Sequence, residues 1–382
     1  MIRYDSPPTP PSPPGFLEAR NRRQKARAAG LSPDHWYPVC QSKKLGKGKV
    51  IGTKFWGRPI AVFRDEKGAA HALEDRCAHR QLKLSLGQVK GCNLICQYHG
   101  WEYDADGKVA AIPHELCGKP FPNLRVGSFP VQERYGLVWI FPGDAALAEV
   151  RKIPDIPELE GNDRWGTILI EAKWKTHHSM VIDNVSDFSH AYLHRKYKPF
   201  WDSKITRCEA VGDRVYVSYN TQIGGGNIFR RFIDKKQINN NHIDLCYEYP
   251  YQWSNTDNKI KDYCFVLPLD EQNTQAFFLF YFKTLSIPFL SLSIPPWLLD
   301  HLLKVANKLL VTPLIMEDRW ACEAEMEGYN RYFDAPIAEF NPAVNLFQQL
   351  TIRKWEEYLA SRQLVSAPHA PDRSAASARA GT

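Results

Sequence analysis

Apolar and polar residues alternate in short runs through the first third of the chain, a pattern typical of β-strands with one buried face. Turn-forming sequences separate the runs, such as Asp-Glu-Lys-Gly at 65–68 and Tyr-Asp-Ala-Asp-Gly at 103–107. We therefore expect residues 36–142 to form a small all-β domain. Its predicted strands include Val50–Phe55, Ile60–Phe63, Ala70–Leu73 and Leu137–Phe141.

Longer elements follow an acidic, proline-containing stretch at 143–162, which we interpret as a linker. The pattern beyond it mixes strands with long helices and predicts an α+β domain over 163–363. The expected strands cover 166–170, 211–219, 243–249, 262–268 and 275–283, and the expected helices cover 174–195, 298–310, 318–329 and 342–362.

The two ends of the chain carry most of its net charge of +7. Residues 1–14 are proline-rich and are expected to be disordered, residues 15–35 read as a basic helix or docking arm, and residues 364–382 read as a disordered tail. The first 30 positions hold six basic residues against two acidic ones. The body of the protein is therefore close to neutral, and nucleic-acid binding is not expected.

Composition indicates an ordinary globular protein, with 44% hydrophobic and 24% charged residues. The nine cysteines lack the density of a disulfide scaffold, and no secretory signal is visible at the N-terminus, so we predict a cytoplasmic protein. The longest uncharged apolar stretch, 284–299, is shorter than the about 20 residues of a spanning helix and contains three prolines. We expect no transmembrane span; a pocket wall is the default interpretation, and peripheral membrane contact stays open.

The strongest chemical signal is a pair of short motifs. Cys77-Ala-His79 is followed, after sixteen residues, by Cys96-Gln-Tyr-His99. Two thiolates and two imidazoles form the ligand set of a Rieske [2Fe–2S] cluster, in which two histidines bind one iron and two cysteines bind the other. A structural zinc site uses the same residue types and is the alternative; it would give a colourless protein.

A second metal site is predicted around residue 190. His190 and His194 are four residues apart, and Asp187 lies three before His190, so a helix would place all three on one face. Two histidines and a carboxylate form the facial triad of non-haem Fe(II) oxygenases. The third ligand must come from elsewhere, and we choose Asp318 over its acidic neighbours Glu317 and Glu323.

With both motifs in place, the chain resembles the oxygenase (α) subunit of Rieske non-haem iron oxygenases. Residues 36–142 look like the family's Rieske domain, and 163–362 look like its catalytic domain, a helix-grip fold related to START lipid-binding domains. The family motif reads acid-x3-Asp-x2-His-x4-His; Asp183, Asp187 and His190 match it, and His194 arrives one residue early. Gln97 stands where the second cluster loop commonly has proline.

The resemblance also implies partners and an assembly. Family members form head-to-tail trimers in which an aspartate links a cluster histidine of one subunit to the iron site of the next; the corresponding residue here is Asp187, between His79 or His99 and His190. A separate NAD(P)H-dependent reductase, directly or through a ferredoxin, would supply the electrons. Consistent with this division, Gly224–Gly226 lacks the spacing and the preceding strand of a nucleotide-binding motif.

The expected function is therefore oxidation of a hydrophobic organic substrate with O2, by hydroxylation, demethylation or oxidative cyclisation. A looser likeness to prodigiosin-type oxidative cyclases favours secondary metabolism. Dihydroxylation of an aromatic ring is the alternative within the class. An electron carrier with a fused ligand-binding domain is the alternative outside it, and would hold two irons per chain where the oxygenase holds three.

Overall fold

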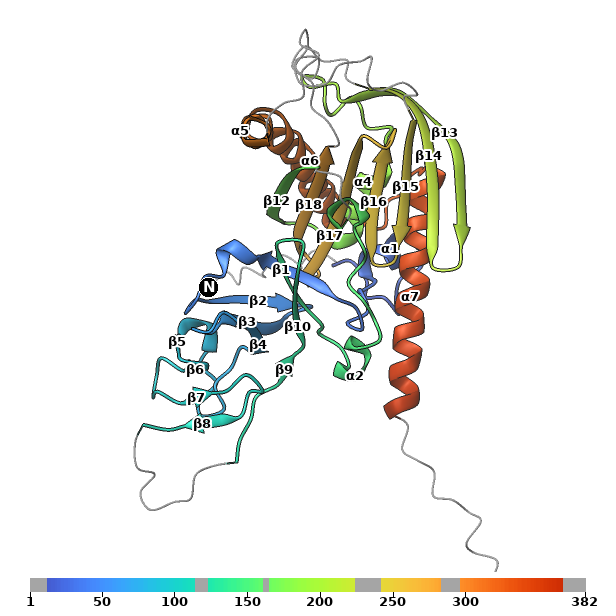
Figure 1. Ribbon diagram of the computed structural model, residues 1–382. Coiled ribbons are helices and arrows are strands. Elements are labelled where there is room, and N and C mark those ends of the chain that lie inside the picture. The colour runs from blue at the N-terminus through green and yellow to red at the C-terminus, as the bar shows by residue number, and fades with distance from the viewer. Residues whose placement is uncertain (1–11, 114–122, 161–164, 224–241, 283–295, 367–382) are drawn as a thin grey trace, which may run out of the picture.

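The computed structural model describes residues 12–113, 123–160, 165–223, 242–282 and 296–366 (Figure 1). An all-β N-terminal part and a large antiparallel sheet with helices confirm the predicted α+β class. Within the described residues, no helix is both long enough and apolar enough to cross a membrane. Most of the apolar stretch at 284–299 lies outside the described residues.

The N-terminal part consists of three small sheets with strand orders β1-β11-β10, β2-β3-β4-β9 and β5-β6-β7-β8. The strands predicted from alternation at 50–55, 60–63, 70–73 and 137–141 correspond to β2, β3, β4 and β11. The elements are α1 (Arg22–Ala28), β1 (Tyr37–Gln41), β2 (Val50–Phe55), β3 (Arg58–Arg64), β4 (Ala70–Glu74), β5 (Gln88–Lys90), β6 (Asn93–Ile95), β7 (Glu102–Tyr103), β8 (Val109–Ala111), β9 (Ser128–Phe129), β10 (Val131–Arg134) and β11 (Leu137–Ile140).

The second part is built on a seven-stranded antiparallel sheet in the order β12-β18-β17-β16-β15-β14-β13. The strand expected over 211–219 is wrong at its start, because the hairpin turn at Gly212 separates two strands there. The elements are α2 (Ala145–Ala148), α3 (Pro157–Glu160), β12 (Gly166–Trp174), α4 (His178–Ser186), β13 (Phe200–Val211), β14 (Arg214–Ile223), β15 (His242–Glu248), β16 (Tyr251–Thr256), β17 (Ile260–Asp270), β18 (Asn273–Phe282), α5 (Pro296–Ala306), α6 (Thr312–Tyr332) and α7 (Pro342–Ser366).

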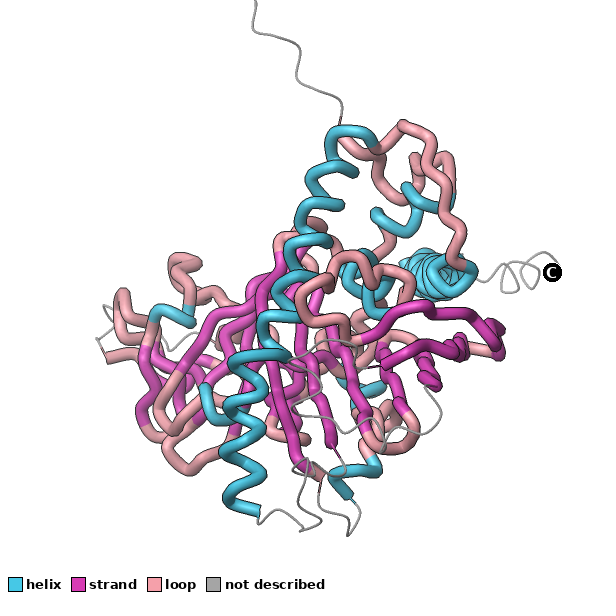
Figure 2. The backbone as a smooth tube through the Cα atoms, turned by 90° about the horizontal axis from the view of Figure 1, so that it is seen from above, coloured by secondary structure: helices cyan, strands magenta, loops and turns pink. Residues whose placement is uncertain are grey.

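Helix α4 packs against both α6 and α7, and all three helices pack against the sheet. Figure 2 shows α7 nearly end-on beside the C-terminus, while the long helix formed by α5 and α6 runs across the view. One example of the packing is Tyr247 of β15, which stacks on Phe347 of α7 with ring centroids 5.1 Å apart. The helices thus cover the face of the sheet that carries the catalytic chemistry described below.

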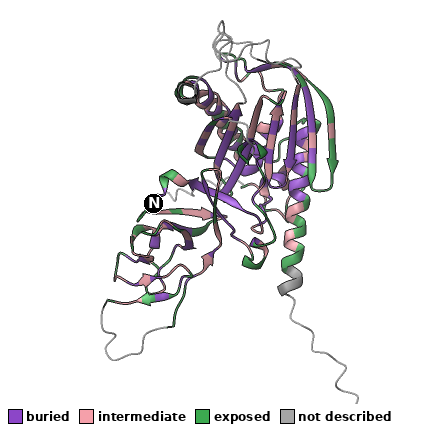
Figure 3. Cartoon of the chain, in the orientation of Figure 1, coloured by how far each residue is buried: buried purple, intermediate pink, exposed green. Residues whose placement is uncertain are grey.

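One hydrophobic core joins the two parts of the molecule. Trp139 of β11 packs edge-on against Phe265 of β17, with ring centroids 5.1 Å apart, and both side chains are fully buried. Figure 3 shows this buried region continuing from the N-terminal strands into the large sheet. The chain between β4 and β8 has a separate small core, which includes the two candidate cluster cysteines. The domain boundaries given above remain a prediction.

Candidate iron-sulfur and iron sites

The two candidate cluster loops follow β4 and β6. The sulfur atoms of Cys77 and Cys96 lie close enough to share a hydrogen bond, and the ring centroids of His79 and His99 are 4.5 Å apart. The two thiols thus lie together, and so do the two imidazoles. This is the arrangement that a [2Fe–2S] cluster bound through two cysteines on one iron and two histidines on the other requires, so the residues present fit the cluster.

Three neighbouring residues support these loops. The Ala78 amide donates to the Tyr103 hydroxyl at 2.8 Å, which leaves the phenolic proton to point at Cys77 Sγ, 3.1 Å away. The indole of Trp101 stacks on His79 with an interplanar angle of 4°. Gly100 has φ +69, and a side chain there would strike Pro113, so this turn requires glycine. A hydrogen bond to a cluster thiolate tunes the reduction potential of the cluster.

The structure corrects the predicted helix over 174–195. Helix α4 ends at Ser186, and Asp187 is extended, with φ −105. The Asp187 side chain accepts a hydrogen bond from the Ser189 amide at 2.8 Å, an aspartate turn that competes with the next helical turn. His190 therefore lies in an irregular segment and His194 in a turn, and the argument from helical phase was wrong.

The three predicted iron ligands nevertheless meet. Nε2 of His190 lies 3.4 Å and Nε2 of His194 lies 3.2 Å from Oδ1 of Asp318, which α6 carries. The candidate ligand atoms of all three lie within 4.8 Å of one another. Because metal–ligand bonds of about 2.0–2.2 Å separate two ligand atoms by about 3–4 Å, one ion fits between them. Two histidines and one carboxylate leave positions open for oxygen and match the donor set of non-haem Fe(II) oxygenases.

Charge around the triad favours a bound cation. Burial would raise the pKa of Asp318, but its hydrogen bonds with His190 and His194 outweigh burial and lower it, so the carboxylate stays ionised. Glu317, considered above as a third ligand, instead lies 2.8 Å from Nδ1 of His194. Burial lowers the pKa of His194, yet the contacts with Asp318 and Glu317 raise it overall. Glu317 thus orients the imidazole so that Nε2 faces the ion.

Glu323, the other alternative, points away from the triad. It accepts hydrogen bonds from the Lys175 amide at 2.9 Å and from Arg319 at 2.8 Å. Of the three acidic residues weighed as the third ligand, only Asp318 contacts both histidines.

Asp187, the predicted bridge between subunits, lies near the surface, and a residue next to α7 fixes its side chain. Asn341, just before α7, donates to Oδ1 of Asp187 at 2.7 Å and to the Tyr219 hydroxyl at 3.1 Å. Tyr219 in turn donates to the carbonyl of Ser186 at 2.9 Å. The second carboxylate oxygen of Asp187 has no hydrogen bond among the described contacts, so it can accept one from an approaching partner. The bridging role itself remains a prediction.

A pocket of about 180 Å³ adjoins the triad. Most of its wall is apolar, formed by side chains from α4, the turns after it, the sheet and α6: Val185, Phe188, Pro199, Phe200, Ile243, Ile260, Phe278, Phe280, Leu314 and Ile315. Larger hollows of about 540 and 910 Å³ contain no member of the triad. A substrate that reacts at the candidate iron site must therefore enter the smaller pocket.

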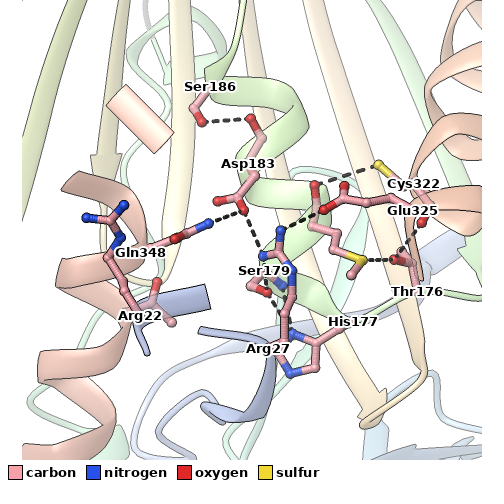
Figure 4. Close-up of polar contacts among 12 residues, drawn as sticks. Arg22, Arg27, Thr176, His177, Ser179, Asp183, Ser186, Cys322, Glu325 and Gln348 are labelled. Atoms are coloured by element: carbon pink, nitrogen blue, oxygen red, sulfur yellow. Dashed lines mark hydrogen bonds and ion pairs between the residues drawn. The ribbon is translucent and has the colours of Figure 1, made fainter. Parts of the chain in front are cut away.

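A buried ionic cluster braces the elements that carry the ligands (Figure 4). Arg27 of α1 reaches Asp183 of α4 at 2.7 Å and Glu325 of α6 at 2.9 Å, and its own side chain is 4% exposed. It also donates to Ser179 of α4, and Gln348 of α7 donates to Asp183 at 2.7 Å. The cluster thus joins four helices, and the basic arm predicted at 15–35 is partly buried.

Comparisons with known proteins agree with both sites. The family model described as "Rieske [2Fe-2S] domain" matches residues 35–130, and the model described as "Vanillate O-demethylase oxygenase C-terminal domain" matches residues 174–362. The two matches define a protein that joins a Rieske domain to an oxygenase domain. The chain belongs to the Rieske non-haem iron oxygenases, as an oxygenase (α) subunit with a [2Fe–2S] cluster and a mononuclear iron.

One relative is similar over nearly its whole length. The 4beta-methylsterol monooxygenase of Methylococcus capsulatus is 41% identical over 92% of this chain and 96% of the relative. The oxygenase component of dicamba O-demethylase from Stenotrophomonas maltophilia is 36% identical over 42% of this chain and 47% of the relative.

Solved structures share the fold. A dicamba monooxygenase structure bound to dicamba has a TM-score of 0.63 at 22% identity and covers 88% of this chain and 99% of the other. Pseudomonas putida NdmA with caffeine has a TM-score of 0.64 at 22% identity and covers 90% and 94%. Because the relatives are oxygenases, the interpretation as a pure electron carrier is wrong.

Proposed function

We propose that this protein oxidises a methyl group at C4 of a sterol. The observation that carries the proposal is the similarity to 4beta-methylsterol monooxygenase, which extends through both iron sites and 92% of this chain. The small, mostly apolar pocket beside the triad suits a hydrocarbon ring. This similarity favours a sterol over the alkyl-chain cyclisation in secondary metabolism that the sequence first brought forward.

The proposal assigns the ligands by their geometry. Cys77, His79, Cys96 and His99 hold the [2Fe–2S] cluster, and His190, His194 and Asp318 hold the mononuclear iron. Iron bound by this triad supplies activation of O2, using electrons that pass through the cluster. One oxygen atom enters a C–H bond of the methyl group, and the other leaves as water with two electrons and two protons.

The protein's own residues position the substrate and keep water out. Phe200 packs edge-on against both histidines of the triad, with ring centroids 5.3 Å from His190 and 5.8 Å from His194. Phe278 and Phe280 of β18 also line the pocket. A methyl group placed between these rings and the iron is surrounded by apolar atoms, which favours a saturated carbon over a polar group there.

Electron supply is proposed to cross between subunits and to begin at a separate NAD(P)H-dependent reductase, directly or through a ferredoxin. In Figure 1, the strands β5–β8 beside the cluster loops and helix α6 lie at opposite ends of the molecule. A neighbouring subunit in a head-to-tail trimer would bring a second cluster to this iron, with Asp187 between them. Mixing an inactive Cys96→Ala variant with an inactive His190→Ala variant should then restore turnover in mixed trimers. Complete inactivity of a verified mixed assembly would contradict this route.

The test of the function is turnover of a 4-methylsterol by the purified holoenzyme with NADH, a ferredoxin and its reductase. The expected product is the C4 hydroxymethyl sterol, identified by mass spectrometry and by incorporation of one atom from labelled O2. His190→Ala should abolish the product while the visible absorption of the cluster persists. If the loaded enzyme consumes no 4-methylsterol but demethylates vanillate or dicamba, the sterol proposal fails and the oxygenase assignment stands.

A further inference from the structure

A carboxyl group from the sheet lines the mostly apolar pocket. Asp262 of β17 lies in the cross-strand row that runs from Ser254 of β16 to Phe280 of β18, and all three side chains line the pocket. Asp262 is only partly buried and borders this cavity. Asp262 contacts neither member of the histidine pair among the described hydrogen bonds and ion pairs, so it is not part of the triad.

Asp262 is only half satisfied. Ser254 donates a hydrogen bond to Oδ1 of Asp262. Within the residues that the structure describes, this is the hydrogen bond that the carboxyl group makes, and no basic side chain pairs with it. Burial raises its pKa to about 6. At pH 8 the group is therefore an ionised acceptor with Oδ2 available to a ligand, and placing such a group in a pocket is costly unless a donor meets it.

The size of the pocket restricts where such a donor can be on the substrate. A volume of about 180 Å³ accommodates about one substituted ring, not a whole sterol. Asp262 and the triad border the same small space. A hydroxyl group at Asp262 and a carbon at the iron must therefore be only a few bonds apart in the substrate. In a 4-methylsterol, the hydroxyl-bearing C3 is the direct neighbour of C4.

We infer that Asp262, supported by Ser254, accepts a hydrogen bond from the 3-hydroxyl group of the sterol and so places the C4 methyl group at the iron. This inference rests on the proposed function and adds the specificity determinant to it. A carboxylate accepts from a hydroxyl group but repels a carbonyl oxygen, so the site should select a 3-hydroxysterol against the 3-oxo analogue. In an analogue without the hydroxyl group, the buried acceptor has no donor. A site with such an unpaired polar group rejects the analogue.

The experiment compares three 4-methylsterols, with a 3-hydroxyl group, with a 3-oxo group and with no oxygen at C3. Dissociation constants are measured at pH 8 with the anaerobic holoenzyme, by quenching of intrinsic fluorescence, and kcat/KM is measured with the ferredoxin and reductase. The variants are Asp262→Asn and Asp262→Leu. The matched control is Asp244→Asn, because Ser218 donates to Asp244 across neighbouring strands in the same way, and Asp244 lies outside the pocket.

The wild-type protein should bind the 3-hydroxysterol at least tenfold more tightly than either analogue. Asp262→Leu should lose this preference. Its affinity for the analogue without oxygen should equal the affinity of the wild type for the same analogue. Asp262→Asn should bind the 3-oxo analogue better than the wild type, because its amide can donate. Asp244→Asn should keep the wild-type preference, and the iron content and cluster absorption of each variant report whether it has folded.

The outcomes separate the two proposals. If the wild type oxidises all three sterols with equal kcat/KM, or if Asp262→Leu keeps the preference, the inference fails and the proposed function stands. If the wild type binds and oxidises none of them, the proposed function fails, and the inference fails with it.

Discussion

Replacing Arg27 by methionine should destabilise the catalytic part of the protein and lower its iron content. The methionine keeps most of the apolar volume but leaves Asp183 buried without its cation. At 2.7 Å, with side chains 4% and 10% exposed, this is a buried ion pair, and removing one partner of such a pair costs about 3–5 kcal/mol. The second partner, Glu325, is 46% exposed, so solvent screens its attraction to Arg27 and this pair contributes little to stability.

The predicted loss is measurable by thermal unfolding. About 1 kcal/mol shifts the midpoint of a domain of this size by about 2–4 °C, so Arg27→Met should lower the unfolding midpoint of the catalytic part by about 6–20 °C. Because α4 leads into the ligand turns and α6 carries Asp318, iron bound per chain should fall as well. Absorption of the cluster, whose loops have a separate core, should persist.

The pH dependence tests the electrostatic reason. Burial raises the pKa of Asp183 to about 6 even beside Arg27, and loss of the cation should raise it further. A carboxyl group whose pKa is raised in the folded state contributes stability at low pH that is lost as the pH rises through that pKa. The deficit of Arg27→Met relative to the wild type should therefore be smaller at pH 5.5 than at pH 8.

A double variant supplies the control. Arg27→Met with Asp183→Asn removes the uncompensated charge, so it should recover much of the midpoint and show little pH dependence in the deficit. An equal deficit at both pH values, or a double variant as unstable as Arg27→Met, would show that lost packing rather than the buried charge is responsible.

Three further predictions concern the iron site. Glu317→Gln should weaken iron binding about tenfold, as measured by Fe(II) titration, because it removes the anionic partner that orients His194; unchanged affinity would exclude that role. Dialysis against a chelator should remove about one iron per chain and all oxygenase activity, while the visible spectrum of the cluster is retained and added Fe(II) restores turnover. Asn341→Ala should lower turnover at least tenfold with full iron content, because Asp187 loses the donor that fixes it; a parallel loss of iron would show that Asn341 supports the iron site instead.

The strands that could be predicted are those with apolar residues on the core side. Two strands of the large sheet were missed for physical reasons. Strand β13 is an edge strand with mostly exposed residues, so it lacks an apolar row. In β16 the alternation is inverted: Gln252, Ser254 and Thr256 point into the molecule and are buried, because part of that face lines the pocket.

The iron ligands could be chosen by residue type but not by local geometry. The pair His190 and His194 indicated a metal site, and the reason given, a shared helical face, was wrong because Ser186 and Asp187 end α4. Both residues are disfavoured in helix interiors and favour turns, so a break in the helix could have been predicted from the sequence. Asp318 could be preferred only by its setting. Glu323 is held by Arg319, a local i,i+4 partner, and by the Lys175 amide just after β12, a contact that no local pattern shows.

Other contributions depend on tertiary contacts alone. In the sequence, Arg27 looks like one charge in a basic run. Its spacing from Gln24 and Ala26, which are also buried, nevertheless marks one side of a short helix. Its partners Asp183 and Glu325 lie more than 150 residues away in the chain. Asp262 likewise reads as a polar residue at the start of a strand, and only the packed sheet shows that it faces a cavity.

If His190, His194 and Asp318 hold the iron as proposed, the metal is a cross-link as well as a reaction centre. His194 and Asp318 are 124 positions apart in the chain, so a metal shared between them closes a long loop and restricts the unfolded chain, as a disulfide would. The cross-link also ties a segment without regular helix to α6. Loss of the metal should free that segment first, and Arg195, Lys196 and Lys198, all exposed, should then become early trypsin sites. Iron occupancy and resistance to proteolysis would rise and fall together.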